Sequence, residues 1–171
     1  MRKVKFLTAD NIGLLHKVGS WVIKKSEGTK FDHVAILITD YGIEWVYEAV
    51  FPNARKIRLD EWKKTFKIID QYELDLDDLG YLKFISELNS QVGKPYSLIQ
   101  LILIWTSNVL GLFESVIRKT IWNGNKALIC TELVARPIHY ALDYNFNKSF
   151  DVIDLNDIKK ALYDLGASRC L

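Results

Sequence analysis

The first half of the chain alternates short apolar runs, rich in β-branched residues, with clusters of turn-forming residues. This pattern is typical of β-strands joined by tight turns. The strongest signal is a hairpin in which Asp40-Tyr41-Gly42 separates two apolar runs. The predicted strands are 4–8, 31–38, 43–50, 56–58 and 67–72.

The second half of the chain carries apolar residues at helical spacing instead. Asp77 is placed to cap one helix, and the turn at 93–95 ends it. The predicted helices are 13–25, the segment after Asp77, 128–142 and 155–165, with a helical turn around 61–62. Strands followed by helices, without regular βα alternation, predict an α+β fold in which a small antiparallel sheet packs against helices. A length of 171 residues is typical of one domain, spanning 1–171.

Composition and charge indicate which classes of protein and partner are not expected for this chain. Apolar residues make up 49% and charged residues 26% of the chain, and the net charge is only +2. Without a run of like charges, a nucleic-acid partner is not expected. The N-terminus shows no secretory signal, so we expect a cytoplasmic protein in which Cys130 and Cys170 are free thiols. No Gly-rich phosphate loop is found, and no cofactor is expected.

One segment, 98–116, is rich in Leu, Ile and Trp but is interrupted by polar residues. A membrane-spanning helix needs about 20 predominantly apolar residues, so we expect membrane contact at most and no span. Two interpretations stay open: a helix or helical hairpin buried in the domain, and an apolar helix that faces substrate or a membrane surface.

The predicted hairpin places a histidine and a carboxylate together. If Ile38 pairs with Ile43, His33 lies directly opposite Glu48. A carboxylate there accepts from one imidazole nitrogen and leaves the other free to act as a base. A three-residue loop would put Ala49 opposite His33 instead, and a plain structural cross-strand pair is the alternative.

Cys130 lies at the start of the predicted helix 128–142, preceded by apolar residues. Helix N-termini stabilise anions, which favours a reactive thiolate. The alternative is an inert buried thiol. A metal site built from His33, Glu48, Cys130 and His139 is a weaker hypothesis, because no pair has a metal-motif spacing.

Four motifs in a fixed order resemble a known superfamily. They are the strand start 31–36 (FDHVAI), the segment 47–49 (YEA), the turn 93–96 (GKPY) and the helix start 130–134 (CTELV). This set resembles the circularly permuted branch of the NlpC-type papain-like superfamily, in its YiiX/YaeF-like group, with the lecithin:retinol acyltransferase-like proteins as relatives. In that branch the His and acid strands precede the Cys helix.

The resemblance implies a thiol-dependent hydrolase (a peptidase or amidase) or an acyltransferase, with Cys130 as nucleophile, His33 as base and Glu48 as the polar third residue. It also implies that Tyr96 lies near the site, where it helps to hold substrate or the oxyanion. The implied substrates are small peptide amides, such as cell-wall peptides, and lipid-linked amides or esters. The main rival is a binding or structural module that keeps the fold without turnover.

Overall fold

A six-stranded antiparallel sheet organises the chain in the computed structural model, which describes residues 1–12, 24, 28–97 and 128–170. The strand order is β4-β3-β2-β1-β5-β6, so neighbours along the chain are mostly neighbours in the sheet. The strands are β1 (Arg2–Asn11), β2 (His33–Asp40), β3 (Ile43–Val50), β4 (Asn53–Arg58), β5 (Phe66–Leu76) and β6 (Ser168–Arg169).

Four α-helices and one 3₁₀ helix accompany this sheet in the described part of the chain. The side chain of Asp77 accepts from the backbone N–H of Gly80 at 2.6 Å and so caps the helix that follows it. Asp154 and Asp157 form a capping box at the last helix. The helices are α2 (Leu59–Trp62), α3 (Asp78–Gln91), α6 (Cys130–Leu142), η2 (Phe150–Val152) and α7 (Leu155–Asp164).

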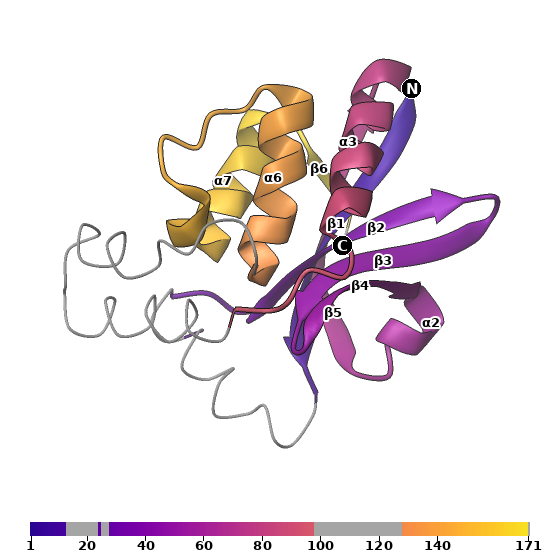
Figure 1. Cartoon of the computed structure of the whole chain (residues 1–171), viewed down its shortest axis with the longest axis vertical. Helices are drawn as coiled ribbons and strands as arrows, with labels where there is room; N and C mark the ends of the chain where they lie inside the picture. Colours follow the sequence, from indigo (N-terminus) through magenta and orange to yellow (C-terminus); the bar gives the residue numbers. More distant parts are fainter. Residues whose placement is uncertain (13–23, 25–27, 98–127, 171) are drawn as a thin grey trace.

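The sheet buries apolar side chains on both faces. One face packs against α3, α6 and α7, which lie together on one side of the sheet (Figure 1). The opposite face packs against α2, which contributes Leu59 and Trp62 to a smaller apolar cluster. Alternation along β1 illustrates the division, since Val4 and Phe6 belong to the larger cluster and Leu7 to the smaller one.

The α+β class predicted from the pattern is confirmed, and most elements lie where they were expected. β3 has the predicted bounds, whereas β1, β4 and β5 extend beyond theirs, and β2 begins and ends two residues later. The helix predicted at 128–142 begins at Cys130 instead, because Leu128 pairs with Tyr96 in a parallel bridge. Extended backbone therefore leads directly into Cys130, the first residue of α6.

Two predicted segments lie outside the described residues: 98–116, and 13–25 apart from Lys24. Among the helices that the structure describes, none combines the length and the apolar character needed to cross a bilayer.

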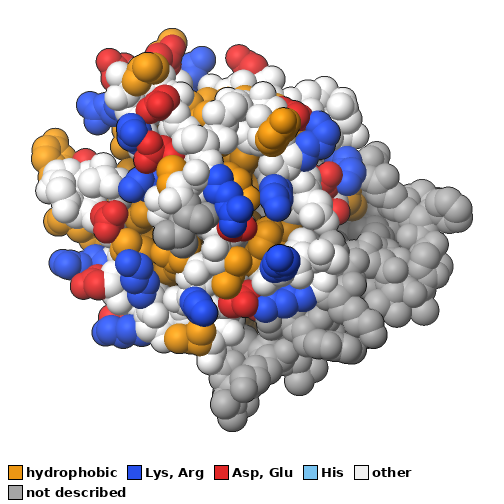
Figure 2. All heavy atoms as spheres, turned by 180° about the vertical axis from the view of Figure 1, so that it is seen from behind, with side chains coloured by type: hydrophobic (Ala, Val, Ile, Leu, Met, Phe, Trp, Pro, Cys, Tyr) orange, Lys and Arg blue, Asp and Glu red, His pale blue; other side chains and the backbone are white. Residues whose placement is uncertain are grey.

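The charged side chains of one face are mixed in sign. Figure 2 shows Lys and Arg side chains interspersed with Asp, Glu and apolar side chains on the face opposite to that of Figure 1. This mixture agrees with the small net charge of +2.

Candidate active site

The β2–β3 hairpin brings His33 and Glu48 together, although not in the predicted register. Asp40 pairs with Ile43, so the turn consists of residues 41–42, whose φ angles of 47° and 77° are both positive, as in a type I′ turn. The prediction that His33 lies directly opposite Glu48 is therefore wrong by two positions.

The predicted contact between His33 and Glu48 survives this correction. Side chains alternate between the faces of a strand, so a shift of two residues leaves every side chain on the same face. His33 and Glu48 are then diagonal neighbours, which is within reach of long side chains. The distance from His33 Nε2 to Glu48 Oε2 is 2.9 Å.

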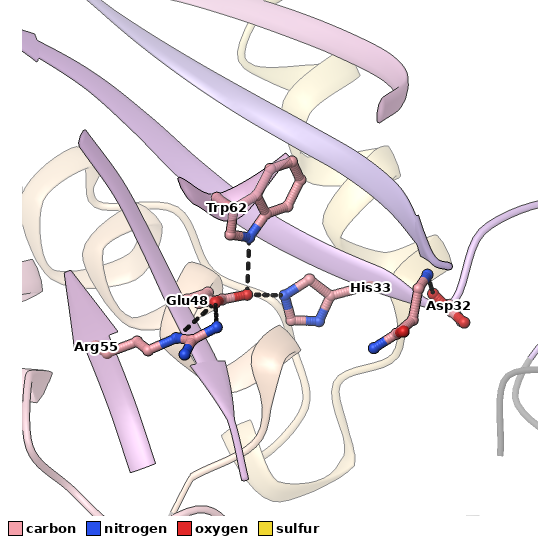
Figure 3. A network of polar contacts seen from close by, with 6 residues as sticks. Asp32, His33, Glu48, Arg55 and Trp62 are labelled. Atoms are coloured by element: carbon pink, nitrogen blue, oxygen red, sulfur yellow. Dashed lines mark hydrogen bonds and ion pairs between the residues drawn. The ribbon is translucent and has the colours of Figure 1, made fainter. Parts of the chain in front are cut away.

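Glu48 is completely buried, and donors from three other elements surround its carboxylate (Figure 3). Its Oε2 accepts from His33 Nε2 and also from Trp62 Nε1, at 2.9 Å each. Its Oε1 accepts from Arg55 Nε at 2.8 Å and forms an ion pair with Arg55 Nη2 at 2.7 Å. Oε2 thus accepts two hydrogen bonds, and Oε1 accepts one and forms an ion pair, which compensates for the loss of hydration that burial imposes on a charge.

These contacts control the ionisation of Glu48. Burial raises its pKa, but the hydrogen bond and charge of His33, the hydrogen bond of Trp62 and the charge of Arg55 outweigh burial and lower the pKa below its ordinary value. Glu48 is consequently a carboxylate at neutral pH.

The ring of His33 is fixed by stacking as well as by hydrogen bonding. It stacks on Phe66, with ring centroids 4.5 Å apart and planes inclined by 19°. Trp62 also stacks on Phe66, at 4.9 Å and 16°. The indole that bonds Glu48 and the imidazole that bonds Glu48 are therefore held by the same aromatic ring.

Cys130 is the first residue of α6, and its side chain is buried except for a small exposed fraction of 8% for the residue. It lies close enough to the His33 ring to raise the pKa of the imidazole. Because Nε2 of that ring faces Glu48, Nδ1 is the nitrogen left for the thiol. The residue before Cys130 is Ile129, which has no polar side chain to cap the helix, so the first N–H groups of α6 receive no cap from it.

The surroundings of His33 favour its charged form. Burial lowers its pKa, but the hydrogen bonds and charges of Cys130 and Glu48 outweigh burial and raise the pKa from 6.5 to about 10. At neutral pH the ring is then an imidazolium with a proton on each nitrogen. This is the charge state expected of a thiolate–imidazolium pair.

Tyr96 lies beside the same residues. Its backbone N–H donates to Pro52 O at 2.9 Å, and the backbone N–H of Leu128 donates to Pro95 O at 2.9 Å, which places the 95–96 segment against the residues that precede α6. Burial raises the pKa of Tyr96, and the negative charges of Cys130 and Asp32 raise it further. Tyr96 thus carries a neutral phenol near Cys130, where the resemblance places it.

Three contributors were missed from the sequence: Arg55, Trp62 and Phe66. A signal existed for Arg55, since a two-residue turn at 51–52 places it directly opposite Glu48, and the β3–β4 register is the observed one. Trp62 and Phe66 come from α2 and the start of β5, and no pairing rule connects them to Glu48.

The hypothetical metal site is not assembled. His139 bonds Tyr144 O through Nδ1 at 2.8 Å and packs against Phe150, more than two turns further along α6 than Cys130. Within the described ranges, no group of three or more His, Cys, Asp and Glu side chains is arranged to hold a metal ion.

Comparison with known proteins adds no relative: no protein-family model matches the chain, and no curated protein sequence matches it significantly.

Proposed function

We propose that the protein is a cysteine hydrolase or acyltransferase of the circularly permuted papain-like type. The observation that carries the proposal is the juxtaposition of three residues: His33 is hydrogen-bonded to the buried Glu48 at 2.9 Å, and Cys130 lies close enough to the His33 ring to raise its pKa. A thiol beside a histidine whose ring is held by a carboxylate is the arrangement that activates thiols in acyl transfer.

The order of these residues along the chain supports the same proposal. The strands that carry His33 and Glu48 precede the helix that begins at Cys130, as in the permuted branch of the superfamily. The Gly-Lys-Pro-Tyr turn leads into the segment that pairs with the residue two positions before Cys130.

The chemistry then proceeds in two steps. The Cys130 thiolate attacks the carbonyl carbon of an amide or ester, and the imidazolium of His33 gives its proton to the leaving amine or alcohol, which leaves a thioester on Cys130. Water, or another hydroxyl or amine, then attacks the thioester carbon while His33 accepts its proton; the C–S bond breaks, which releases the acyl product as an acid, ester or amide and restores the Cys130 thiolate. Glu48 holds the ring in place throughout. The N–H groups that begin α6, together with the phenol of Tyr96, are the donors available to the oxyanion.

The substrates we propose are small peptide amides and lipid-linked amides or esters. Both present an uncharged carbonyl to the thiolate, and neither requires a metal or cofactor.

One observation favours a rival, a binding module of the same fold without turnover. Cys130 is only 8% exposed, and burial in apolar surroundings makes thiols unreactive. The exposed Cys170 provides an internal standard against which this can be measured.

The test is thiol labelling of the folded protein at neutral pH with iodoacetamide, with mass spectrometry to assign the labelled residue. We expect Cys130 to react faster than Cys170, and we expect His33→Ala to abolish that advantage. An activated acetyl ester should in addition leave an acetyl group on Cys130. An inert Cys130 in the folded wild type, or an unchanged rate in His33→Ala, would favour the binding module.

A further inference from the structure

Within the part of the chain that the structure describes, Arg55 contacts the proposed site through Glu48. It lies on β4 directly opposite Glu48 on β3, and two of its nitrogens converge on the same carboxylate oxygen, Oε1, at 2.8 and 2.7 Å. The other oxygen, Oε2, is taken by His33 and Trp62. The carboxylate is therefore shared between a permanent cation on one side and the imidazole on the other (Figure 3).

The charges around His33 come from several elements. Glu48 faces it from β3, Cys130 from α6, and Arg55 lies behind Glu48 on β4. Asp32 precedes it in the chain, and the carboxylate of Asp32 accepts the backbone N–H of Asn11 at 3.2 Å. The neighbours that α2 and β5 contribute, Trp62 and Phe66, are uncharged.

An uncompensated carboxylate would be a poor partner for this histidine. The proposed reaction requires the imidazolium to give up its proton to the leaving group, and general acids work best when their pKa lies near the operating pH. A buried negative charge in contact with the ring, in addition to the thiolate, would hold the proton too strongly. A guanidinium on the far oxygen offsets part of the Glu48 charge while keeping the acceptor in place.

We infer that Arg55 is a positioning residue of the proposed reaction: it orients the Glu48 carboxylate and offsets part of its charge, so that the carboxylate holds the His33 proton less strongly than it would alone. The inference rests on the proposed function for its catalytic meaning, but its electrostatic effect on His33 can be measured without a substrate.

The experiment follows the protonation of the His33 ring by NMR in histidine-labelled protein. The chain has 3 histidines, so the His33 signal is assigned by its loss in His33→Gln. The variants are Arg55→Gln, which removes the charge, and Arg55→Lys, which keeps the charge but not the fork of donors. Arg58→Gln is the matched control, because Arg58 lies on the same strand but pairs with Asp60.

We expect Arg55→Gln to move the His33 midpoint to higher pH by about one unit, because it removes the repulsion between two cations that lie on either side of one carboxylate. The side chain of Arg55 is 40% exposed, and solvent screening keeps the shift from being larger. Arg55→Lys should stay close to wild type, as should Arg58→Gln. If Arg55→Gln does not fold, the test rests on Arg55→Lys. An upward shift of the His33 midpoint by a full unit in Arg55→Lys, where the charge is retained, would overturn the inference.

Iodoacetamide labelling of Cys130 in the same samples separates this inference from the proposed function. A shifted midpoint with a reactive Cys130 supports both. A shifted midpoint with an inert Cys130 supports the electrostatic role of Arg55 and overturns the function. An unchanged or lowered midpoint in folded Arg55→Gln overturns the inference whatever Cys130 does.

Discussion

Glu48→Gln is the substitution that tests most directly whether the buried carboxylate holds this part of the fold together. Glutamine has the same shape as glutamate but offers one carbonyl oxygen and one NH₂ group. Four donor contacts, from His33, Trp62 and two nitrogens of Arg55, converge on the two oxygens of Glu48. Whichever way the amide is turned, its NH₂ group faces donors instead of accepting from them.

The expected loss of unfolding free energy follows from the hydrogen-bond donors that the substitution leaves without an acceptor. The substitution breaks two charge-assisted hydrogen bonds and places donor against donor in a site where Glu48 is 0% exposed. Removing one partner of a buried ion pair typically costs about 3–5 kcal/mol. We therefore expect the free energy of unfolding to fall by about 3–5 kcal/mol. With a denaturant slope of about 2 kcal/mol per molar urea, this is a midpoint shift of about 2 M.

The assay is urea unfolding followed by far-ultraviolet circular dichroism at neutral pH. Glu61→Gln is the matched control: its partner is Lys64 at 2.6 Å, and the side chain of Glu61 is 62% exposed. Because exposed ion pairs contribute little, the control should unfold close to wild type. If Glu48→Gln also unfolds close to wild type, the carboxylate is not the centre of a stabilising network and the reasoning is wrong.

Two further predictions concern the rest of the network. His33 has a pKa raised from 6.5 to about 10, so its contribution to stability is fully present below pH 6.5 and is lost as the pH rises through about 10. Urea midpoints measured from about pH 8 to 10.5 should therefore fall more steeply in wild type than in His33→Gln, and parallel curves would contradict the raised pKa. Phe66→Ala removes the ring on which His33 and Trp62 stack at 4.5 and 4.9 Å, and should cost about 3–5 kcal/mol of unfolding free energy. A cost below about 1 kcal/mol would show that the stack is not what fixes these rings.

The β2–β3 hairpin shows which features a local sequence pattern predicts and which it does not. Alternation of apolar residues was sufficient to find both strands and to place His33 and Glu48 on one face, because the face depends only on whether the register is odd or even. The register itself was missed because the turn places Tyr41 at a φ of 47°. Only Gly, Asn and Asp adopt this region readily, so a tyrosine there gives no signal of a type I′ turn.

The helix that carries Cys130 shows a different limit. Its apolar spacing was sufficient to predict a helix over 128–142, but the pairing of Leu128 with Tyr96 delays its start to Cys130. A bridge between two segments this far apart in sequence is a tertiary contact, which helical periodicity does not report. The shift matters for chemistry, because it places the thiol in the first turn, where the helix dipole favours an anion.

The environment of Glu48 explains why Cys130, His33 and Glu48 alone could not form the whole candidate site. A carboxylate that is fully removed from water requires acceptor sites to be filled on both oxygens, and His33 can fill only one of them. A buried Glu48 beside His33 therefore needs further donors, and the sequence pattern did not identify them. The fold supplies them from β4 and α2, as Arg55 and Trp62. A buried acid beside a predicted catalytic histidine is thus itself a reason to look for a cation and a neutral donor in the strands and turns that follow it.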